Sequence, residues 1–183
     1  MEQPNAGILL IAEPFLKDPN FMRTVVFLCD HQSEGSVGFV LNRRYNISLN
    51  DLIDLELDRI IPIYYGGPVQ LDNIHFIHQR PDIIQGGTEI IKGVFWGGEF
   101  DEVVDLLKAN LLGDDDIRFY IGYSGWGIGQ LEEELSTNSW LTVKAVKQII
   151  FHNKNEELWK DALDLMGKDY RIMKNFPIDP QLN

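Results

Sequence analysis

The sequence predicts a single α+β domain whose sheet is largely antiparallel, curved and barrel-like. Its first half is a series of short β-branched and aromatic runs separated by turn residues, which is typical of strands. The early runs are joined by short turns, and short turns connect antiparallel neighbours. The second half alternates strands with two amphipathic helical patterns. Together these observations favour α+β over a doubly wound α/β fold.

Each strand is expected where an apolar run stops at glycine, proline or polar residues. Gly7 to Ala12 is wholly apolar, as in a buried strand. The polar stretch 30–36 separates two such runs and predicts the turn of a hairpin. The full set of expected strands covers residues 7–12, 23–29, 37–42, 61–65, 73–78, 89–96, 117–123 and 139–143.

Two long helices are expected from apolar residues at helical spacing. In Glu99 to Leu112 these residues follow the i, i+3, i+4, i+7 pattern, and Gly113 stands where a helix-ending glycine is favoured. Glu156 to Met166 has an apolar face of the same kind. Short helices are expected after Ser48, whose hydroxyl can cap one, and at 130–135.

No internal repeat, low-complexity tract or linker divides the 183 residues, so one domain over 1–183 is expected. Its core is expected at about 7–167. The C-terminal tail, 168–183, contains two prolines and is expected to lie along the surface or fray.

The charge of the chain argues against nucleic acid as a direct partner. Asp and Glu number 28 against 16 Lys and Arg, for a net charge of −12. Duplex DNA requires basic side chains gathered on one face, and anionic membrane surfaces are disfavoured for the same reason. Only Arg43-Arg44 and a few tail residues form basic groups. A protein partner, or a small ligand in a local positive pocket, remains open.

The cysteine content and the N-terminus predict a cytoplasmic protein. Cys29 is the only cysteine, so no intrachain disulfide can form, which suits a reducing compartment. The first residues lack the positive region of a signal peptide, and no apolar run approaches the length of a membrane span.

Several long sequence blocks occur in a fixed order. They are GILLIAEPFLKDPNFMRTVVFLCDH from Gly7, GSVGFVLNR from Gly35, YYGGPV from Tyr64, and GYSGWGIGQLEEEL from Gly122, followed by Trp140-Leu141. With these blocks the chain resembles the AlgH/YqgE family of bacterial proteins over nearly its whole length, from about residue 7 to residue 167.

The resemblance implies a bacterial cytosolic protein with one α+β domain, in which the sheet forms a pseudo-barrel and helices pack outside it. It implies no reaction and carries no catalytic residues; family members are often labelled transcriptional regulators. Three positions depart from the family pattern as follows. Arg44 stands where proline is common, and Ser36 and Ser124 stand where alanine is common.

The glycine-rich segment around Ser124 matches no catalytic or nucleotide-binding motif. A nucleophile elbow requires glycine two positions after the serine, where this chain has Trp126. The glycines at 122, 125, 127 and 129 also lack dinucleotide spacing, and a Walker A lysine is missing. Two interpretations stay open: a tight turn that packs Trp126 on the sheet, and backbone amides before Gln130 that hold an anion.

Other reactive residues are interpreted as structural or solvated. Cys29 and His31 would share one face of a strand, but Cys29 ends an apolar run and is expected to be buried and inert. His75 and His78 would face opposite ways on a strand and have no cysteine ligands beside them. The run 114–116 of three aspartates lacks the pattern of a calcium loop. We therefore expect no catalytic residue, metal or cofactor.

The remaining candidates lie at strand ends and glycine turns, where clefts form on a sheet scaffold. Arginines beside aromatic rings suit a planar or anionic ligand. Alternatively, the arginines pair with carboxylates and the rings fill the barrel. The candidate ligand-binding residues are Arg23, Asn42, Arg43, Tyr65, Tyr123 and Trp126, with Tyr64 beside them.

Three functions are compared. The favoured one is a non-catalytic binding or regulatory protein that acts through an unknown protein partner or small ligand. The alternative is an enzyme of unrecognised type whose cleft contains Arg23, Asn42, Tyr65, Tyr123 and Trp126. The third, a regulator that binds DNA directly, is not expected, because of the net charge and the lack of a basic helix.

Overall fold

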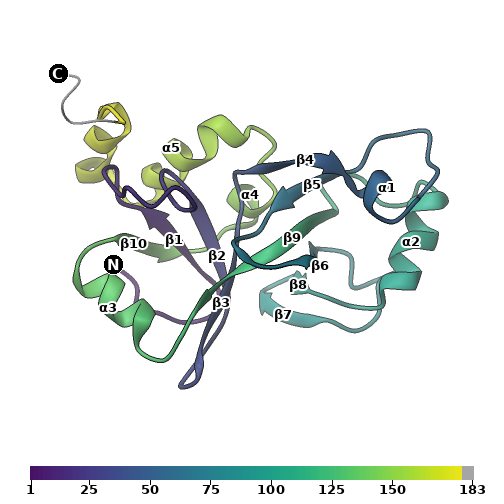
Figure 1. Ribbon diagram of the computed structural model, residues 1–183, viewed down its shortest axis with the longest axis horizontal. Helices are drawn as coiled ribbons and strands as arrows, with labels where there is room; N and C mark the ends of the chain where they lie inside the picture. Colours follow the sequence, from purple (N-terminus) through teal and green to yellow (C-terminus); the bar gives the residue numbers. More distant parts are fainter. Residues whose placement is uncertain (179–183) are drawn as a thin grey trace.

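The computed structural model describes residues 1–178 and contains a ten-stranded sheet that is not closed (Figure 1). The main path of the sheet runs β10-β1-β2-β3-β9-β6-β8-β7, while β5 pairs with β9 and β4 pairs with β5. All pairings among these residues are antiparallel except that of β5 with β9. The predicted α+β class and its largely antiparallel sheet are therefore confirmed.

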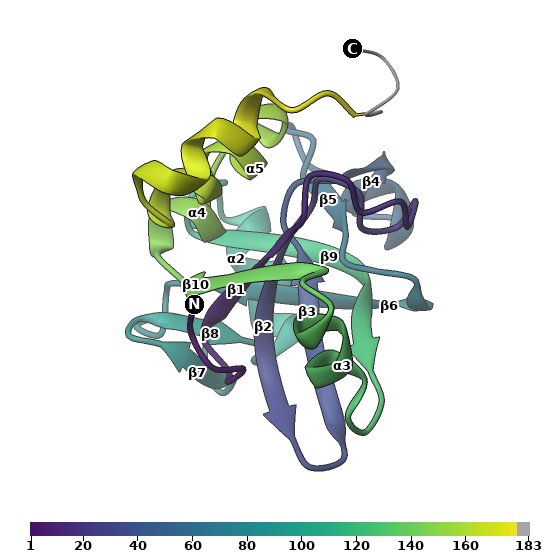
Figure 2. The same ribbon diagram turned by 90° about the vertical axis from the view of Figure 1, so that its left-hand side faces the viewer.

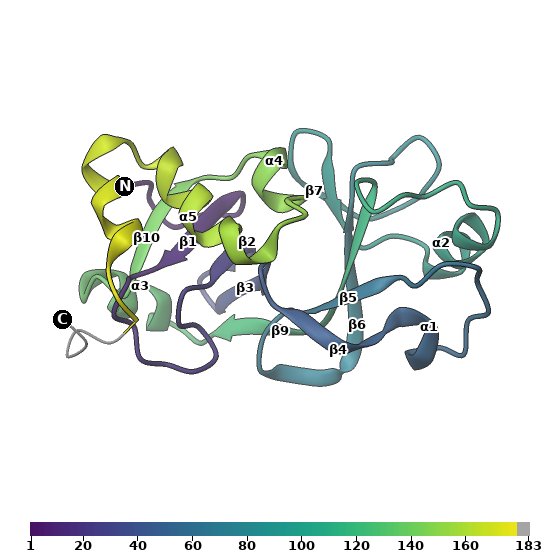
Figure 3. The ribbon, with the colours of Figure 1, turned by 90° about the horizontal axis from the view of Figure 1, so that it is seen from above.

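The sheet has two halves, which Figure 3 shows side by side with β9 passing from one to the other. The first half contains β1 (Ile8–Ala12), β2 (Val25–Gln32), β3 (Gly35–Val40) and β10 (Trp140–Lys144). The second half contains β4 (Arg44–Ser48), β5 (Pro62–Tyr65), β6 (Val69–His78), β7 (Thr88–Ile91) and β8 (Val94–Trp96). The long strand β9 (Ile117–Trp126) pairs with β3 in the first half and with β5 and β6 in the second.

Helices cover both faces of the first half and one side of the second (Figures 1 and 2). The alternation of β1 explains this arrangement, because successive side chains of a strand point to opposite faces. Leu9 and Ile11 pack with α5, whereas Leu10 packs with Leu131 of α3. The helices are α1 (Leu49–Leu52), α2 (Phe100–Lys108), α3 (Gln130–Ser136), α4 (Lys147–Ile150) and α5 (Asn155–Leu165), followed by the 3-10 helix η1 (Lys168–Asn175).

A separate core lies under α2 in the second half. Val103 and Leu107 of α2 are buried against Phe119 and Ile121 on one face of β9. Tyr120, on the other face of the same strand, belongs to the core under α5. The strand β9 is thus buried on both faces, which explains the near-continuous apolar run in its sequence.

Several expected elements differ in the structure. Residues 89–96 form a hairpin rather than one strand, because Gly93 has φ 72°, which glycine adopts without steric cost, and lets the chain turn back. The helix predicted over 99–112 ends at Lys108. The first part of the tail forms η1 and lies along the surface of α5, which is the first of the two expected arrangements. Residues 179–183 lie outside the described part of the chain.

The glycine pair in the block YYGGPV permits a close approach between two strands. A Cβ atom on Gly67 would lie 2.3 Å from the carbonyl oxygen of Tyr123, and one on Gly66 would lie 2.3 Å from the oxygen of Gly122. Gly66 N–H instead donates to the Ile121 carbonyl at 2.9 Å. These two glycines thus allow the chain after β5 to lie directly against β9.

Candidate functional site

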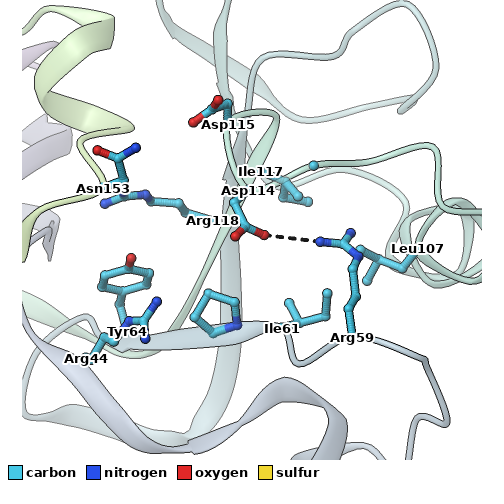
Figure 4. Close-up of a pocket in the computed structure, with 12 residues that line it drawn as sticks. Arg44, Arg59, Ile61, Tyr64, Leu107, Asp114, Asp115, Ile117, Arg118 and Asn153 are labelled. Atoms are coloured by element: carbon cyan, nitrogen blue, oxygen red, sulfur yellow. Dashed lines mark hydrogen bonds and ion pairs between the residues drawn. The ribbon is translucent and has the colours of Figure 1, made fainter.

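A polar cavity of about 270 Å³ lies where the two halves of the molecule meet (Figure 4). We call it the arginine pocket, because three arginines from distant parts of the chain line it. The second half contributes β4, β5, α2 and the segments before β5 and β9, the long strand β9 contributes its first residues, and the first half contributes the loop between α4 and α5. Its lining residues are Arg44, Arg59, Ile61, Pro62, Tyr64, Leu107, Gly113, Asp114, Asp115, Ile117, Arg118 and Asn153.

Arg118 is the most buried of the three arginines, with 4% of its surface exposed. Its guanidinium packs on Tyr64, 4.7 Å from the ring centroid. It donates to two backbone carbonyls, those of Leu41 and His152. Within residues 1–178 no carboxylate lies within ion-pair distance of it. Its charge is therefore buried without a compensating anion, an arrangement that costs free energy unless hydrogen bonds or a ligand offset it.

Arg59 stands at the opposite wall of the pocket. Its Nη1 forms an ion pair with Asp114 at 3.1 Å, and its Nη2 donates to the Leu112 carbonyl. Its Nε is buried and has no hydrogen-bond partner in the described chain. Asn50 anchors the backbone on both sides of the arginine, since its side chain bonds the Arg59 carbonyl at 3.0 Å and the Ile61 N–H at 2.8 Å. The Nε–H of Arg59 thus has no acceptor in the described chain, and the backbone around it is held in place by Asn50.

Arg44, the first residue of β4, lies at the mouth of the pocket and is exposed. Its side chain makes no ion pair or hydrogen bond to any residue between 1 and 178. Three guanidinium groups therefore face two carboxylates, of which Asp114 is already paired and Asp115 lies apart from that pair (Figure 4). Guanidinium forks match carboxylate and phosphate oxygens, so this cavity is suited to an anion.

The structure places the first four sequence-predicted residues around the loop between β1 and β2. Asn42 accepts a hydrogen bond from Val25 N–H at 3.0 Å and donates to the Arg23 carbonyl at 2.9 Å. Arg43 donates to the carbonyls of Pro19 and Met22 at 2.6 and 3.1 Å. These contacts hold residues 19–25 in place.

Arg23 and Tyr65 belong to the same bracing network. Arg23 has φ 53°, an uncommon value for arginine. Its guanidinium lies over Trp159, 4.7 Å from the ring centroid, and donates to the Phe176 carbonyl. Tyr65 donates to the Asn20 side chain at 3.1 Å. Burial lowers the pKa of Arg23 and raises the pKa of Tyr65. These contacts give Arg23 and Tyr65, which lie in two of the long sequence blocks, a structural role.

Tyr123 and Trp126 lie elsewhere, at the far end of β9. Both line an open hollow of about 550 Å³ beside the β2–β3 hairpin. Trp126 is buried, and its indole N–H donates to Glu134 of α3 at 2.9 Å. Trp140 donates to the same carboxylate oxygen at 2.8 Å. The six predicted residues thus form two separate groups and do not share one cavity, and their role in binding stays a prediction.

The reactive residues for which the sequence predicts no catalytic role are buried or hydrogen-bonded in the structure. Ser124 is buried and donates to the Gly66 carbonyl at 2.9 Å. Burial, with a contribution from Asp30, raises the pKa of the Cys29 thiol. A bulge in β2 between Leu28 and Asp30 breaks the register at Cys29, and the His31 imidazole bonds Ser36 at 2.8 Å. In the described part of the chain, no three metal-binding side chains gather as a metal site.

Sequence reasoning did not assign the three arginines of the pocket to a site. One signal was available for Arg118, which stands alone in the apolar run of β9 and must therefore be buried. Another was Arg44, which departs from the resembled family pattern. Arg59 carries no such signal, and only the fold brings it to the other two.

The fold and the pocket define an α+β protein with an open antiparallel sheet and a cationic cavity between its halves. The AlgH-like family model matches residues 9–171, and the chain belongs to this family. It is 44% identical to a UPF0301 protein of Chlorobium limicola over 177 residues, which cover 97% of this chain and 95% of the relative. It is 38% identical to a UPF0301 protein of Cytophaga hutchinsonii, covering 97% and 98% of the two chains.

Two solved structures share the fold. The solution structure of the AlgH protein from Pseudomonas aeruginosa superposes with a TM-score of 0.73 at 32% identity, covering 97% of this chain and 98% of that one. A crystal structure of a Corynebacterium diphtheriae protein gives a TM-score of 0.78 at 18% identity, covering 96% and 94%. Among residues 1–178, no helix has the length and apolar character needed to cross a membrane.

Proposed function

We propose that this protein is a non-catalytic binding protein whose arginine pocket takes a small anionic ligand with phosphate or carboxylate oxygens. The observation that carries the proposal is the buried Arg118, a residue that is 4% exposed and whose guanidinium has no carboxylate partner within residues 1–178. An anion in the pocket would compensate that charge and accept hydrogen bonds from Arg44 and from the free Nε of Arg59.

The size and chemistry of the cavity limit the ligand. A volume of about 270 Å³ lies just below the range of roughly 300–1,000 Å³ found for drug-sized ligands. The lining is polar, and Asp115 and Asn153 can accept hydrogen bonds from the ligand. A compact, hydroxylated anion therefore matches the pocket better than a large or apolar one.

The position of the pocket supports a regulatory role as part of the proposal. Arg118 bonds the His152 carbonyl in the α4–α5 loop of the first half, and Asn153 of the same loop lines the pocket. Arg59 and Asp114 belong to the second half. A bound anion would contact both halves at once, and its occupancy would favour one relative arrangement of the loops around it.

The test is calorimetric titration with inorganic phosphate. Arg44 is exposed, so Arg44→Ala removes one ligand contact without disturbing a core. We expect one saturable site in the wild type and at least about a tenfold loss of affinity in Arg44→Ala, as for a lost charge-assisted hydrogen bond. The matched control is Arg171→Ala, which removes an exposed arginine on η1 that is not among the residues lining the pocket. Equal affinities for all three proteins, or no binding at millimolar phosphate, would overturn the proposal.

A further inference from the structure

A second hollow of about 580 Å³ adjoins the arginine pocket and shares Arg44, Pro62 and Asp114 with it. It follows β4 and is more apolar than its neighbour. Ile47 on β4 and Ile60 before β5 line it, with 39% and 79% of their surfaces exposed. Two exposed isoleucines beside a cationic cavity form a surface on which an apolar group and an anionic group can be bound together.

The strand β4 supplies a free sheet edge at this hollow. Among residues 1–178 it pairs with β5 alone, and the two are matched only at Arg44 with Tyr64 and at Ser48 with Pro62. Figure 1 shows β4 at the margin of the second half, next to α1. An edge strand presents unpaired N–H and C=O groups that can pair with another chain.

The Arg44 end of the hollow favours an acidic group. The Asp51 carboxylate accepts hydrogen bonds from the Ser48 hydroxyl at 2.6 Å and the Ser48 N–H at 3.2 Å, within the cap of α1. Asp114 is paired with Arg59. Asp114 is thus compensated by Arg59, and Asp51 keeps its negative charge at the α1 end of the hollow, whereas Arg44 has no ion-pair partner in the described chain.

We propose that β4 and the adjoining arginine pocket form a docking groove for a short, extended acidic segment of a partner protein. The segment adds a strand to β4, places a carboxylate at Arg44 and buries an apolar side chain against Ile47 and Ile60. This inference rests on the proposed anion site and names its partner. A free small anion would fill the arginine pocket but leave the isoleucines exposed and the β4 edge unpaired.

The test uses fluorescence anisotropy with a labelled peptide in which glutamate alternates with isoleucine. Ile60→Ser should weaken its binding at least about fivefold, as expected for the loss of a partly buried isoleucine contact. The matched control is Ile128→Ser, because Ile128 is 80% exposed, as Ile60 is 79% exposed, and lies outside the groove. Neither serine variant should change the affinity for inorganic phosphate, while Arg44→Ala should weaken both ligands.

Two further peptides test the mode of binding. A peptide in which lysine replaces glutamate should not bind, and a peptide N-methylated at alternate residues should bind at least about tenfold more weakly, because strand addition depends on backbone N–H donors. The docking groove would be overturned if the glutamate peptide bound equally well to the wild type and to Ile60→Ser. It would also be overturned if the lysine peptide or the N-methylated peptide bound as tightly as the glutamate peptide. If phosphate does not bind but the glutamate peptide binds and loses affinity in Ile60→Ser, the small-anion proposal is refuted and the docking groove stands.

Discussion

Asp114 acts in this structure as a built-in anion for the arginine pocket, so its removal should strengthen ligand binding. Its carboxylate lies 3.1 Å from Arg59, and its side chain is 68% exposed. Exposed ion pairs of this kind contribute about 0.2–1 kcal/mol. The Asp114 carboxylate compensates part of the Arg59 charge and repels an anion at the free Nε, so Asp114→Asn should raise the affinity for phosphate about two- to fivefold.

The matched variant is Asp115→Asn, which removes the same charge from the same loop but breaks no side-chain ion pair within residues 1–178. Calorimetric titration of both variants with phosphate at one ionic strength separates the loss of competition from the general change in charge. A gain for Asp114→Asn that exceeds the gain for Asp115→Asn supports the reasoning. Equal gains, or a loss for Asp114→Asn, would refute it.

Three other predictions concern the framework around the site. Glu134→Ala should lower the melting temperature by several degrees, because two buried indole N–H groups lose their acceptor at about 1–3 kcal/mol each, whereas Glu134→Gln keeps an acceptor and should have a small effect. The Cys29 thiol, buried and with a raised pKa, should react with an alkylating reagent only after denaturation, which mass spectrometry detects. Burial disfavours the charged imidazole and lowers the pKa of His75 below its usual 6.5. The unfolded chain therefore takes up a proton at His75 more readily than the folded chain does. The stability that depends on a neutral His75 is present above pH 6.5 and is lost as the pH falls. The melting temperature of His75→Phe should decline less between pH 7 and pH 5 than that of the wild type, and an equal decline would contradict the assignment.

Most strands were predictable because apolar, β-branched runs mark buried strands wherever turn residues bound them. The strand β4 was not, since its sequence, RYNIS, has no apolar run and most of its residues are exposed. An edge strand with one neighbour carries little of the burial signal on which such predictions depend. The short helix α4 was missed for a related reason: four residues are too few to show a helical period.

The candidate site was less predictable than the fold. The sequence placed Arg23, Asn42 and Tyr65 at strand ends and glycine turns as candidate ligand-binding residues. In the structure their partners are backbone carbonyls and a neighbouring side chain. Arg44, Arg59 and Arg118 are distant in sequence. The parallel pairing of β5 with β9, a long-range contact, brings them together. No local pattern encodes that pairing.

The measurement that tests the central claim most directly is an NMR titration with inorganic phosphate that follows the arginine Nε–H and asparagine side-chain resonances. The proposal predicts saturable shifts of the Arg59 and Arg118 Nε–H signals and of the Asn153 amide, with one dissociation constant for all three. The signals of Arg23 and Arg43, which brace the loop between β1 and β2, should not move. Shifts confined to Arg23 and Arg43, or no saturable shift in the arginine pocket, would contradict the account.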